Sequence, residues 1–336
     1  MITLGIESSC DDTSIALVED GTRVISSLVS SQIEIHRRFG GVVPEVASRK
    51  HLEAILPLLR DCLDGAGIKI SDIGQVAATA GPGLLGPLLV GLSTAKALAW
   101  HTGKPLIPVN HIEAHLTASF LTAGRTPEYP FLGLIVSGGH SNLVLAEGPR
   151  QYRVLGQTLD DAPGELFDKV ARHLQLGYPG GPIIQKTGEN GDHKRYQLPR
   201  PMAGKGYTFS FSGLKTAVMR IVAHEKDNLS LPDLCASLQH AVSETFAEKV
   251  SMALKETRAR RLILAGGVAA NAVLRKDMQQ LADRYRAELL LPSLHLCTDN
   301  AAMIAAHGYH TAQLAPADSL AVNAVASWDM GGPYNF

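Results

Sequence analysis

Cysteine is scarce in this sequence, and the patterns in which cysteines hold a metal or a disulfide framework are missing. Cys10, Cys62, Cys235 and Cys297 are scattered through 336 residues, and no two of them form a CxxC pair. This excludes a zinc ribbon and a disulfide scaffold, and it is typical of a chain kept in a reducing cytosol. The first residues also lack the basic and long apolar regions of a signal peptide, so we expect a cytoplasmic protein.

A surplus of positive charge is missing too. The chain has 31 lysines and arginines against 32 aspartates and glutamates, which gives a formal net charge of -1. Proteins that bind nucleic acid non-specifically are usually much more basic. Any contact with RNA must therefore come from a local patch or from a partner protein.

Uninterrupted apolar runs of membrane-spanning length are also missing. The longest apolar stretch, residues 84–100, is interrupted by Gly86, Pro87, Gly91 and Lys96. We interpret it as a buried core helix and expect no association with a membrane.

Two common nucleotide-binding motifs are absent as well. No GxGxxG opens a helix after a strand, and no GxxxxGKS or GxxxxGKT occurs. Residues 211–216 resemble the end of the second motif, but they lack its upstream glycine. The sequence therefore excludes a dinucleotide-binding fingerprint and a P-loop.

What the chain does contain is an internal repeat. Hydrophobic residues make up 45% and charged residues 19% of a length that suits two lobes. Residues 4–21 and 134–148 share one pattern, in which an apolar strand, a small polar turn and a second apolar strand end at a glycine. Third strand-like runs follow at 23–29 and 152–155, so each segment is predicted to be a β-meander.

The parallel continues beyond the meanders, because each is followed by helical segments and then by a strand, a glycine turn and a helix. In the first half these are a helix at 44–63, a strand at 76–79, Gly81-Pro82-Gly83 and a long helix. In the second half they are helices at 165–176 and 234–255, a strand at 262–264, Gly266-Gly267 and a helix from about Asn271.

Two copies of this unit predict an α/β fold of the duplicated actin/sugar-kinase/Hsp70-like (ASKHA) type, with two lobes and an interlobe cleft. The alternative is a single doubly wound α/β domain that repeats by accident, and we favour the duplication. The predicted division is an N-terminal lobe at 1–130, a C-terminal lobe at 131–325 and a tail at 326–336, whose last residues we expect to be frayed.

The turns of the two meanders differ in chemistry. Residues 137–141 offer consecutive backbone N–H groups with no Cβ in the way, which is an anion-binding nest. Residues 8–13 instead carry Asp11 and Asp12, which suit a cation that accompanies phosphate. A third loop, 265–271, permits close approach of a flat base, and its final asparagine could bond a sugar or base. One such loop is usually only a tight turn, but three at matching places indicate nucleotide binding.

His111 and His115 form the sharpest chemical signal. Four residues apart on a helix, they share one face and are close enough to hold one cation. Glu113 falls on the far side of that helix, which argues against the glutamate-activated water of zinc proteases. Asp299, at the start of the last helical run, is the candidate third ligand, and this donor set suits Fe(II) or Zn(II). Taken alone, the two histidines would be interpreted as part of an ordinary helix surface. The glycine loops expected nearby favour a metal site instead.

Several further motifs spread over nearly the whole chain are specific when taken together. They are GIESSCD at 5–11, GVVPEVASR at 41–49, GPG at 81–83, HIEAH at 111–115, VSGGH at 136–140, FDK at 167–169, YPGGP at 178–182, FSFSGLKT at 209–216 and GGVAAN at 266–271. With these motifs the chain resembles the family of tRNA threonylcarbamoyladenosine transferases, in its bacterial TsaD branch.

The resemblance implies an acyl transfer. The family moves a threonylcarbamoyl group from its mixed anhydride with AMP to N6 of the adenosine just 3′ of the anticodon, in tRNAs that read ANN codons, and releases AMP. By motif match, His111, His115 and Asp299 would hold the metal. The residues that would hold the adenylate are Ile135, Val136, Ser137, Gly138, Gly139, Asp168, Gly181, Gln185 and Asn271.

Partners are implied in the same way. They are tRNA, threonylcarbamoyl-AMP with ATP or AMP, a non-catalytic paralogue (TsaB), a small ATPase (TsaE) and a TsaC-type enzyme that supplies the adenylate. Mg(II) is expected to accompany the nucleotide. Asp12 stands where the family commonly has glutamate, so the charge is kept but one methylene of reach is lost. Gln185 stands where many members have aspartate, so a charge is lost there.

Asp11 and Asp12 are the candidate catalytic residues. Because an adenine amine is a poor nucleophile, one of them would take its proton or hold a second cation, and the sequence leaves both roles open. The metal would polarise the acyl oxygen or orient the phosphate. The amides of residues 137–139 would stabilise charge on the leaving phosphate.

Contact with tRNA is predicted from two basic stretches, although solvated surface is the alternative for any one residue. They are His36-Arg37-Arg38 and the group Lys194, Arg195, Arg200, Lys205 and Lys215.

Four other functions compete with tRNA modification. They are a metalloendopeptidase built on the histidine pair, a small-molecule kinase of the same fold, a non-catalytic scaffold and a carbamoyltransferase that acts on small metabolites. The paired histidines argue against the scaffold, and the small-molecule carbamoyltransferase shares most of the chemistry.

Overall fold

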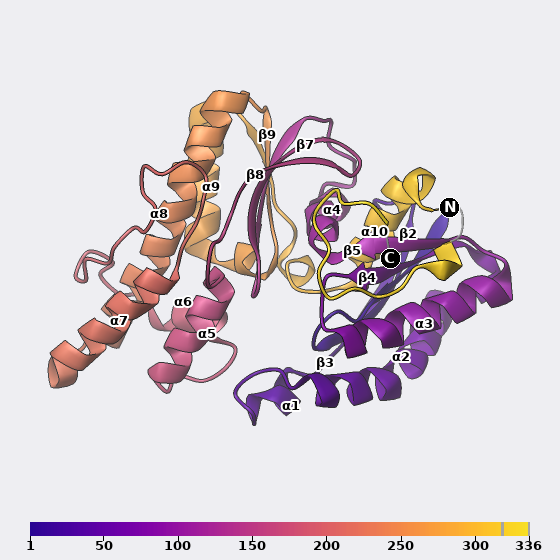
Figure 1. The fold of residues 1–336 in the computed structure, drawn as a ribbon, viewed down its shortest axis with the longest axis horizontal. Helices are drawn as coiled ribbons and strands as arrows, with labels where there is room; N and C mark the ends of the chain where they lie inside the picture. Colours follow the sequence, from indigo (N-terminus) through magenta and orange to yellow (C-terminus); the bar gives the residue numbers. More distant parts are fainter. Residues whose placement is uncertain (317–318, 335–336) are drawn as a thin grey trace. The chain divides into compact units, whose positions relative to one another are not determined.

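The computed structural model describes residues 1–316 and 319–334 (Figure 1). Contacts group the chain into two compact units, which are described separately. Unit 1 contains Met1–Glu128, Gly148–Tyr152 and Pro292–Phe336, and unit 2 contains Tyr129–Glu147 and Arg153–Leu291. In the described part of the chain, each unit is built on one five-stranded sheet.

The sheet of unit 1 has the strand order β3-β2-β1-β4-β5. Its strands are β1 (Ile2–Glu7), β2 (Asp12–Glu19), β3 (Arg23–Ser31), β4 (Ile73–Gly81) and β5 (Leu106–Asn110). β2 pairs antiparallel with β1 and β3, whereas β4 runs parallel to both β1 and β5. The carboxyl ends of β1, β4 and β5 therefore lie side by side, which is where open α/β sheets place their functional groups.

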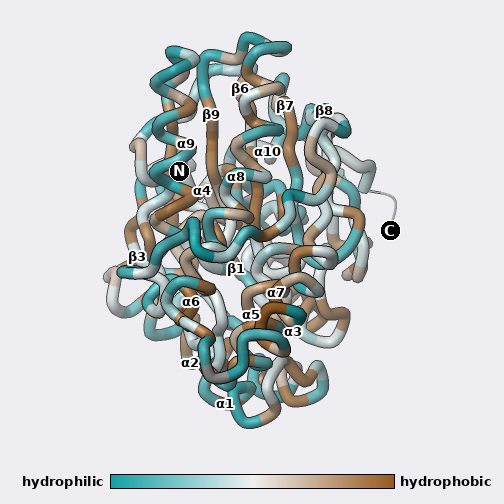
Figure 2. The backbone as a smooth tube through the Cα atoms, turned by 90° about the vertical axis from the view of Figure 1, so that its left-hand side faces the viewer, coloured by the Kyte–Doolittle hydropathy of each residue, from teal (hydrophilic) through white to brown (hydrophobic). Residues whose placement is uncertain are grey.

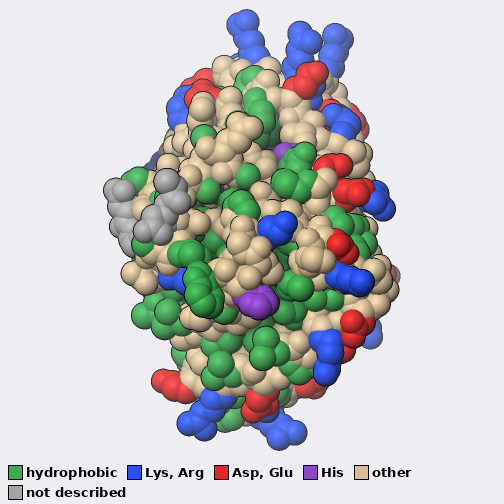
Figure 3. Space-filling model, turned by 90° about the vertical axis from the view of Figure 1, so that its right-hand side faces the viewer, with side chains coloured by type: hydrophobic (Ala, Val, Ile, Leu, Met, Phe, Trp, Pro, Cys, Tyr) green, Lys and Arg blue, Asp and Glu red, His purple; other side chains and the backbone are tan. Residues whose placement is uncertain are grey.

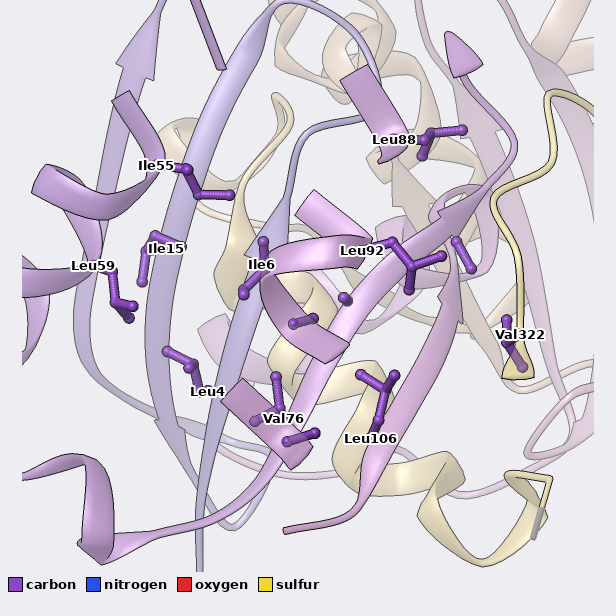
Figure 4. Close-up of a cluster of buried hydrophobic side chains, with 14 of the residues drawn as sticks. Leu4, Ile6, Ile15, Ile55, Leu59, Val76, Leu88, Leu92, Leu106 and Val322 are labelled. Atoms are coloured by element: carbon purple, nitrogen blue, oxygen red, sulfur yellow. The ribbon is translucent and has the colours of Figure 1, made fainter. Parts of the chain in front are cut away.

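Side chains alternate between the two faces of this sheet, and both faces are apolar, so helices cover both. Leu4, Ile6 and Ile15 point to the face covered by α2 (Pro44–Ala66) and α3 (Leu85–Thr102), as Figure 4 shows. Ala16 and Val18 point to the face covered by α4 (His111–Ala123) and α10 (Ala301–Thr311). The short helix α1 (Ile33–Arg37) precedes α2.

A glycine in β1 brings α10 close to the sheet. A Cβ at Gly5 would lie 2.2 Å from the carbonyl oxygen of Ala301, so a side chain there would push the start of α10 away. This close approach places the residues just before α10 near the carboxyl end of β1.

Unit 2 has the sheet order β10-β9-β6-β7-β8. Its strands are β6 (Phe131–Val136), β7 (Ser141–Gly148), β8 (Gln151–Gln157), β9 (Arg261–Ala265) and β10 (Glu288–Leu290). Figure 2 shows β7 and β9 as largely hydrophobic segments. The helices are α5 (Pro163–His173), α6 (Gly180–Thr187), α7 (Ser212–Glu225), α8 (Leu231–Thr257) and α9 (Ala272–Tyr285).

The two sheets have one topology. The order β3-β2-β1-β4-β5 corresponds strand for strand to β8-β7-β6-β9-β10, with an antiparallel meander followed by parallel strands in each. This confirms the predicted duplicated α/β fold and excludes a single doubly wound sheet. The predicted helices and strands after the meanders correspond to α2, β4, α3, α5, α8, β9 and α9, although α5 ends at His173, three residues before the predicted end.

The contact-defined units differ from the predicted division at residues 148–152, which belong to unit 1, and after residue 291. Residues 292–325 were assigned by sequence to the second lobe, but they belong to unit 1 because α10 packs on the first sheet. The predicted tail is ordered as far as Tyr334, since Trp328 is only 8% exposed and the N–H of Gly331 donates to Glu113 at 2.7 Å. We expected fraying over residues 331–336; these contacts contradict it for 331–334, and residues 335–336 lie outside the described residues.

The apolar stretch at 84–100 forms most of α3, which is not fully buried as predicted but exposes apolar residues on one side. Leu88 and Leu92 are buried, whereas Leu85, Leu89 and Trp100 are exposed. In the ranges that the structure describes, no helix has the length and apolar character needed to cross a membrane.

Candidate metal centre and nucleotide-binding loops

The metal-ligand candidates stand at the starts of two helices of unit 1. Asn110 ends β5 and caps α4, because its Oδ1 accepts hydrogen bonds from two backbone N–H groups of the first turn at 2.9 and 3.2 Å. His111 opens the capped helix, and His115 follows on the same face with its ring centroid 4.8 Å away. Asp299 lies just before α10.

These three side chains converge as predicted. Oδ1 of Asp299 lies 3.5 Å from Nε2 of His111 and 3.6 Å from Nε2 of His115, and one ligand atom from each residue lies within 4.8 Å of the others. Metal–N and metal–O bonds of about 2.0–2.2 Å place tetrahedral ligands roughly 3.4 Å apart. The spacing therefore fits a single divalent ion, and two histidines with one carboxylate suit Fe(II) or Zn(II).

Behind His111 lies a buried carboxylate that we did not single out from the sequence. Oε2 of Glu7 lies 2.9 Å from Nδ1 of His111 and accepts a hydrogen bond from the Thr79 hydroxyl at 2.7 Å. Its Oε1 accepts from the N–H of Ser9 at 2.5 Å. This contact directs Nε2 of His111 toward Asp299, as carboxylates do behind metal-binding histidines. The available signal was a glutamate at the end of an otherwise largely apolar strand.

Charge around His111 controls its ionisation. Burial acts to lower the pKa of His111, but Glu7 and Asp299 outweigh burial and hold that pKa well above its ordinary value. Burial likewise acts to raise the pKa of Glu7, and His111 outweighs it, so the pKa of Glu7 is lowered. Because a metal ligand must be deprotonated, a metal bound here would have to displace any proton from Nε2 of His111.

The polar turn after β1 adjoins this centre. Ser9 Oγ lies 3.2 Å from Nδ1 of His111. Burial raises the pKa of Asp11, and burial together with Asp11 and Asp299 raises the pKa of Asp12 to about 7. Oδ1 of Asp12 is buried and has no hydrogen-bond partner among the described residues. A carboxyl group that titrates near neutrality is well matched to accepting a proton.

Glu113 lies away from the metal candidates, as predicted. It is fully buried, its Oε1 accepts the N–H of Gly331, and its Oε2 lies 3.3 Å from Nε of Arg150. It therefore cannot reach a water bound at the metal candidates. This argues against a metalloendopeptidase, which would need this glutamate as its general base.

In unit 2 the predicted nest at 137–141 joins β6 to β7. The turn is closed by the N–H of Ser137, which donates to the carbonyl of His140 at 2.9 Å. A Cβ added at Gly138 or Gly139 would meet no atom within 4 Å in the described parts of the chain. The side of each glycine on which a side chain would stand is therefore open, which leaves room for an anion beside the turn.

The two residues before this turn can act only through their backbone. Ile135 and Val136 have fully buried side chains in β6. Directly after this strand, the carbonyls of Ser137 and Gly138 accept two N–H groups from the start of α5 at 3.3 and 3.1 Å. The nest is thus fixed between a buried strand and a helix.

The remaining predicted adenylate residues link three helices of unit 2. Oδ1 of Asp168 on α5 accepts the N–H of Gly180 at 2.7 Å, beside Gly181 on α6. Gln185 on α6 accepts the N–H of Ala272 at 2.7 Å through Oε1. These contacts bring α5, α6 and the start of α9 together.

Asn271 has a structural task in addition to the predicted one. Its Oδ1 caps α9 by accepting two backbone N–H groups at 3.0 and 3.1 Å, and its Nδ2 donates to Gln239 at 2.8 Å. Gln185 and Asn271 thus both engage the start of α9. Gly181 remains open, since a Cβ there would meet no described atom within 4 Å.

The predicted basic patches are largely neutralised. His36 is fully buried and lies 3.1 Å from Oε1 of Gln32, so its assignment to an RNA surface is wrong. The others with ion-pair partners are Arg37 with Glu34, Arg195 with Asp233, Arg200 with Glu244, and Lys215 with Asp161. On the face shown in Figure 3, lysines and arginines are dispersed among acidic side chains instead of gathered in one patch.

The fold is shared with solved structures. HypF in its phosphate- and nucleotide-bound form superposes with a TM-score of 0.63 at 11% identity, over 95% of this chain and 47% of that one. The ROK hexokinase from Thermus thermophilus superposes with a TM-score of 0.50 at 15% identity, over 94% and 99% of the chains. The two units thus form a protein of the actin/sugar-kinase/Hsp70-like class.

Within this class the family is shown by sequence. The family model described as TsaD, tRNA N6-adenosine threonylcarbamoyltransferase, matches residues 23–306. The curated tRNA N6-adenosine threonylcarbamoyltransferase of Pelobacter propionicus is 51% identical over 98% of each chain, and that of Trichlorobacter lovleyi is 49% identical over 98% of this chain and 97% of the other. The chain belongs to the TsaD family.

Proposed function

We propose that this protein transfers a threonylcarbamoyl group from threonylcarbamoyl-AMP to N6 of the adenosine just 3′ of the anticodon in tRNAs that read ANN codons. In this step the N6 amine forms a bond to the carbamoyl carbon, the bond from that carbon to the phosphate oxygen breaks, and AMP leaves. The observation that carries the proposal is full-length identity of about half to tRNA N6-adenosine threonylcarbamoyltransferases, together with the converging His111, His115 and Asp299.

Unit 2 supplies the adenylate-binding residues in this proposal. The N–H groups of the open nest at Gly138 and Gly139 bind the phosphate of the adenylate and stabilise the charge that grows on it as AMP leaves. Asp168, Gly181, Gln185 and Asn271 bind the nucleoside, for which the glycine has open space. Because Gln185 is uncharged, its contact with a ribose hydroxyl is a neutral hydrogen bond and weaker than that of an aspartate.

Unit 1 supplies the acid–base chemistry. Asp12 accepts the proton that the N6 amine loses, because its pKa of about 7 leaves it half ionised at neutral pH and one carboxylate oxygen is without a hydrogen-bond partner among the described residues. Asp11, whose pKa burial also raises, would hold a cation such as Mg(II) that accompanies the nucleotide.

His111, His115 and Asp299 would hold one Fe(II) or Zn(II) ion, which supplies Lewis-acid polarisation when bound. Glu7 keeps Nε2 of His111 directed at the site, and the hydroxyl of Thr79 holds Glu7 in turn. The protein thereby fixes its ligands before the ion arrives, so little ordering is needed on binding.

Exposed leucines support a protein partner for unit 1. Leu52 and Leu56 on α2 are 65% and 62% exposed, and Leu85 and Leu89 on α3 are 49% and 46% exposed. Both pairs have the i, i+4 spacing that puts them on one face of a helix, and α2 packs beside α3 (Figure 1). Exposed apolar stripes of this kind bind other helices, so we assign this surface to the non-catalytic paralogue (TsaB).

The other partners follow from the chemistry of the reaction. A mixed anhydride with AMP must be made by an ATP-consuming enzyme, which we take to be of the TsaC type, and the small ATPase (TsaE) acts with the paralogue. Because Arg195, Arg200 and Lys215 of the candidate basic group are each paired with an acid, much of the affinity for tRNA comes from these partners. The protein works where tRNA and reduced thiols coexist, in the cytoplasm.

The experiment that tests the proposal is a reconstituted reaction. The purified chain, threonylcarbamoyl-AMP, unmodified tRNA and the two partner proteins are mixed, and the tRNA is digested to nucleosides for mass spectrometry. We expect threonylcarbamoyladenosine and AMP in equal amounts, and none with His111→Ala. AMP release without a modified nucleoside would mean that the acyl group goes to water, and would contradict transfer to tRNA.

A further inference from the structure

Glu113 is a fully buried carboxylate that the proposed function leaves without a task. Its Oε1 accepts the N–H of Gly331 at 2.7 Å, and its Oε2 lies 3.3 Å from Nε of Arg150 and 3.2 Å from Nε2 of His307. A buried charge is costly unless it is paired and hydrogen-bonded, and this one has a partner on each oxygen. So complete a set of contacts indicates that the position of Glu113 is fixed.

The contact with His307 joins the two helices that carry the metal-ligand candidates. Glu113 stands on α4 between His111 and His115, and His307 stands on α10, whose start follows Asp299. A second contact crosses the same pair of helices, since the hydroxyl of Thr117 on α4 donates to a carbonyl of α10 at 3.0 Å. The spacing between the histidines and Asp299 is therefore set by how α4 and α10 are held together.

Arg150 and the C-terminal residues close the third side of Glu113. The Arg150 guanidinium donates to the carbonyl of Gly332 and lies 4.0 Å from the ring centre of Tyr334. Nδ2 of Asn110, the residue that caps α4, donates to the carbonyl of Trp328 at 3.1 Å. The segment 328–334 is thus bound both to the cap of α4 and to the carboxylate inside its first turns.

We propose that Glu113 and His307 are positioning residues for the metal centre, and that Arg150 and the segment 328–334 hold Glu113 in place. The inference rests on the proposed function, because it requires a metal at His111, His115 and Asp299. A metal site tolerates only about 0.2 Å of error in its ligand distances. A slight slide of α4 along α10 exceeds this tolerance while leaving the apolar contacts of the two helices in place.

The test measures metal binding instead of turnover. Zn(II) affinity is determined by competition with a chromophoric chelator, and the absorption spectrum of the Co(II)-loaded protein reports ligand geometry. We compare the full chain with Glu113→Gln, which keeps the shape but removes the charge, and with Arg150→Gln. His111→Ala gives the background from binding elsewhere on the chain.

The matched control is Gln75→Ala. Gln75 is buried in the same unit and donates to the Thr3 hydroxyl at 3.0 Å near the start of β4, the opposite end of that strand from Thr79. The variant therefore loses a buried hydrogen bond at the end of β4 that lies away from the metal-ligand candidates. Its melting temperature shows how much of any change in metal binding comes from lost stability alone.

We expect Glu113→Gln and Arg150→Gln to weaken Zn(II) binding about 10- to 100-fold, the range typical of residues behind metal ligands, and to change the Co(II) spectrum. Gln75→Ala should leave both unchanged. If Glu113→Gln does not fold, Arg150→Gln decides alone. Wild-type affinity and spectrum in the variants would overturn the inference and leave the metal centre standing. A wild type that binds no more metal than His111→Ala would overturn the metal centre and the inference together.

Discussion

Oε2 of Glu7 lies 2.9 Å from Nδ1 of His111, in a position fully closed to solvent, and the same oxygen accepts the hydroxyl of Thr79. The carboxylate thus selects which imidazole nitrogen faces Asp299. Glu7, at the end of the first strand, thus orients His111, which lies 104 positions later in the chain.

Replacing Glu7 by glutamine should weaken the metal centre. The amide keeps the shape of the carboxylate but accepts the Nδ1–H of His111 more weakly, so it orients the imidazole less firmly and makes Nε2 a weaker ligand; we expect metal affinity to fall about 10- to 100-fold. Isothermal titration with Zn(II) measures the change. Glu53→Gln, on the exposed side of α2, is the control and should bind as the wild type does; equal affinity in both variants would contradict the role of Glu7.

Asp12 should make the transfer depend on pH. Its pKa of about 7 means that the base is ionised above this pH and protonated below it, so kcat/KM should fall about tenfold per pH unit below 7 and level off above. Asp12→Asn should lose most of the activity. A rate that is flat from pH 5.5 to 8.5 would assign the proton transfer to another group.

The same carboxyl group should cost stability at high pH. Its pKa in the folded chain is raised above the ordinary value of 3.8, so its contribution to stability is complete below pH 4 and is lost as pH rises through 7. We therefore expect Asp12→Asn to melt a few degrees above the wild type at pH 8, with the gap shrinking toward pH 4. Thermal scans across this range provide the measurement, and a gap that does not depend on pH would refute the raised pKa.

Two glycine-to-alanine changes should affect different properties, one substrate binding and the other stability. Gly138→Ala meets no described atom within 4 Å and needs no left-handed backbone, so the fold tolerates it while the methyl group obstructs a phosphate. We expect KM for the adenylate to rise several-fold with an unchanged melting temperature. Gly266 has φ +90° and a Cβ there would lie 2.4 Å from the carbonyl of Val136, so Gly266→Ala should lower stability by about 1 kcal/mol or more. The two variants are separated by melting curves and kinetics on the same samples.

The exposed leucines should matter only for assembly. The double variant Leu52→Glu, Leu56→Glu places two charges on the stripe of α2, so binding of the paralogue should fall at least tenfold while the melting temperature stays within about 1 °C. Sedimentation velocity with the purified paralogue measures the complex. Leu59→Glu, whose side chain is buried on the other face of the helix, should instead unfold the chain. Undiminished binding by the double variant would place the partner elsewhere.

Local patterns were enough to predict the repeat and much of the site. The alternation of apolar residues and the polar turns at 8–13 and 137–141 predicted both meanders, because side-chain direction in a strand depends only on position. The four-residue spacing of His111 and His115 predicted their shared face for the same reason. Asp299 was identified from its place before a helix and from the family motifs.

Only the tertiary structure brought distant residues to one point. Parallel pairing of β1 with β4 and β5 sets Glu7 beside Thr79 and His111, and no pattern in the sequence specifies which strands become neighbours. The return of α10 to the first sheet is decided by the close approach at Gly5, which placed residues 292–325 in a unit that chain order did not suggest. Burial, which gives Asp12 its pKa near 7 and His36 its structural role, likewise arises from residues far apart in the chain and exists only once they are packed together.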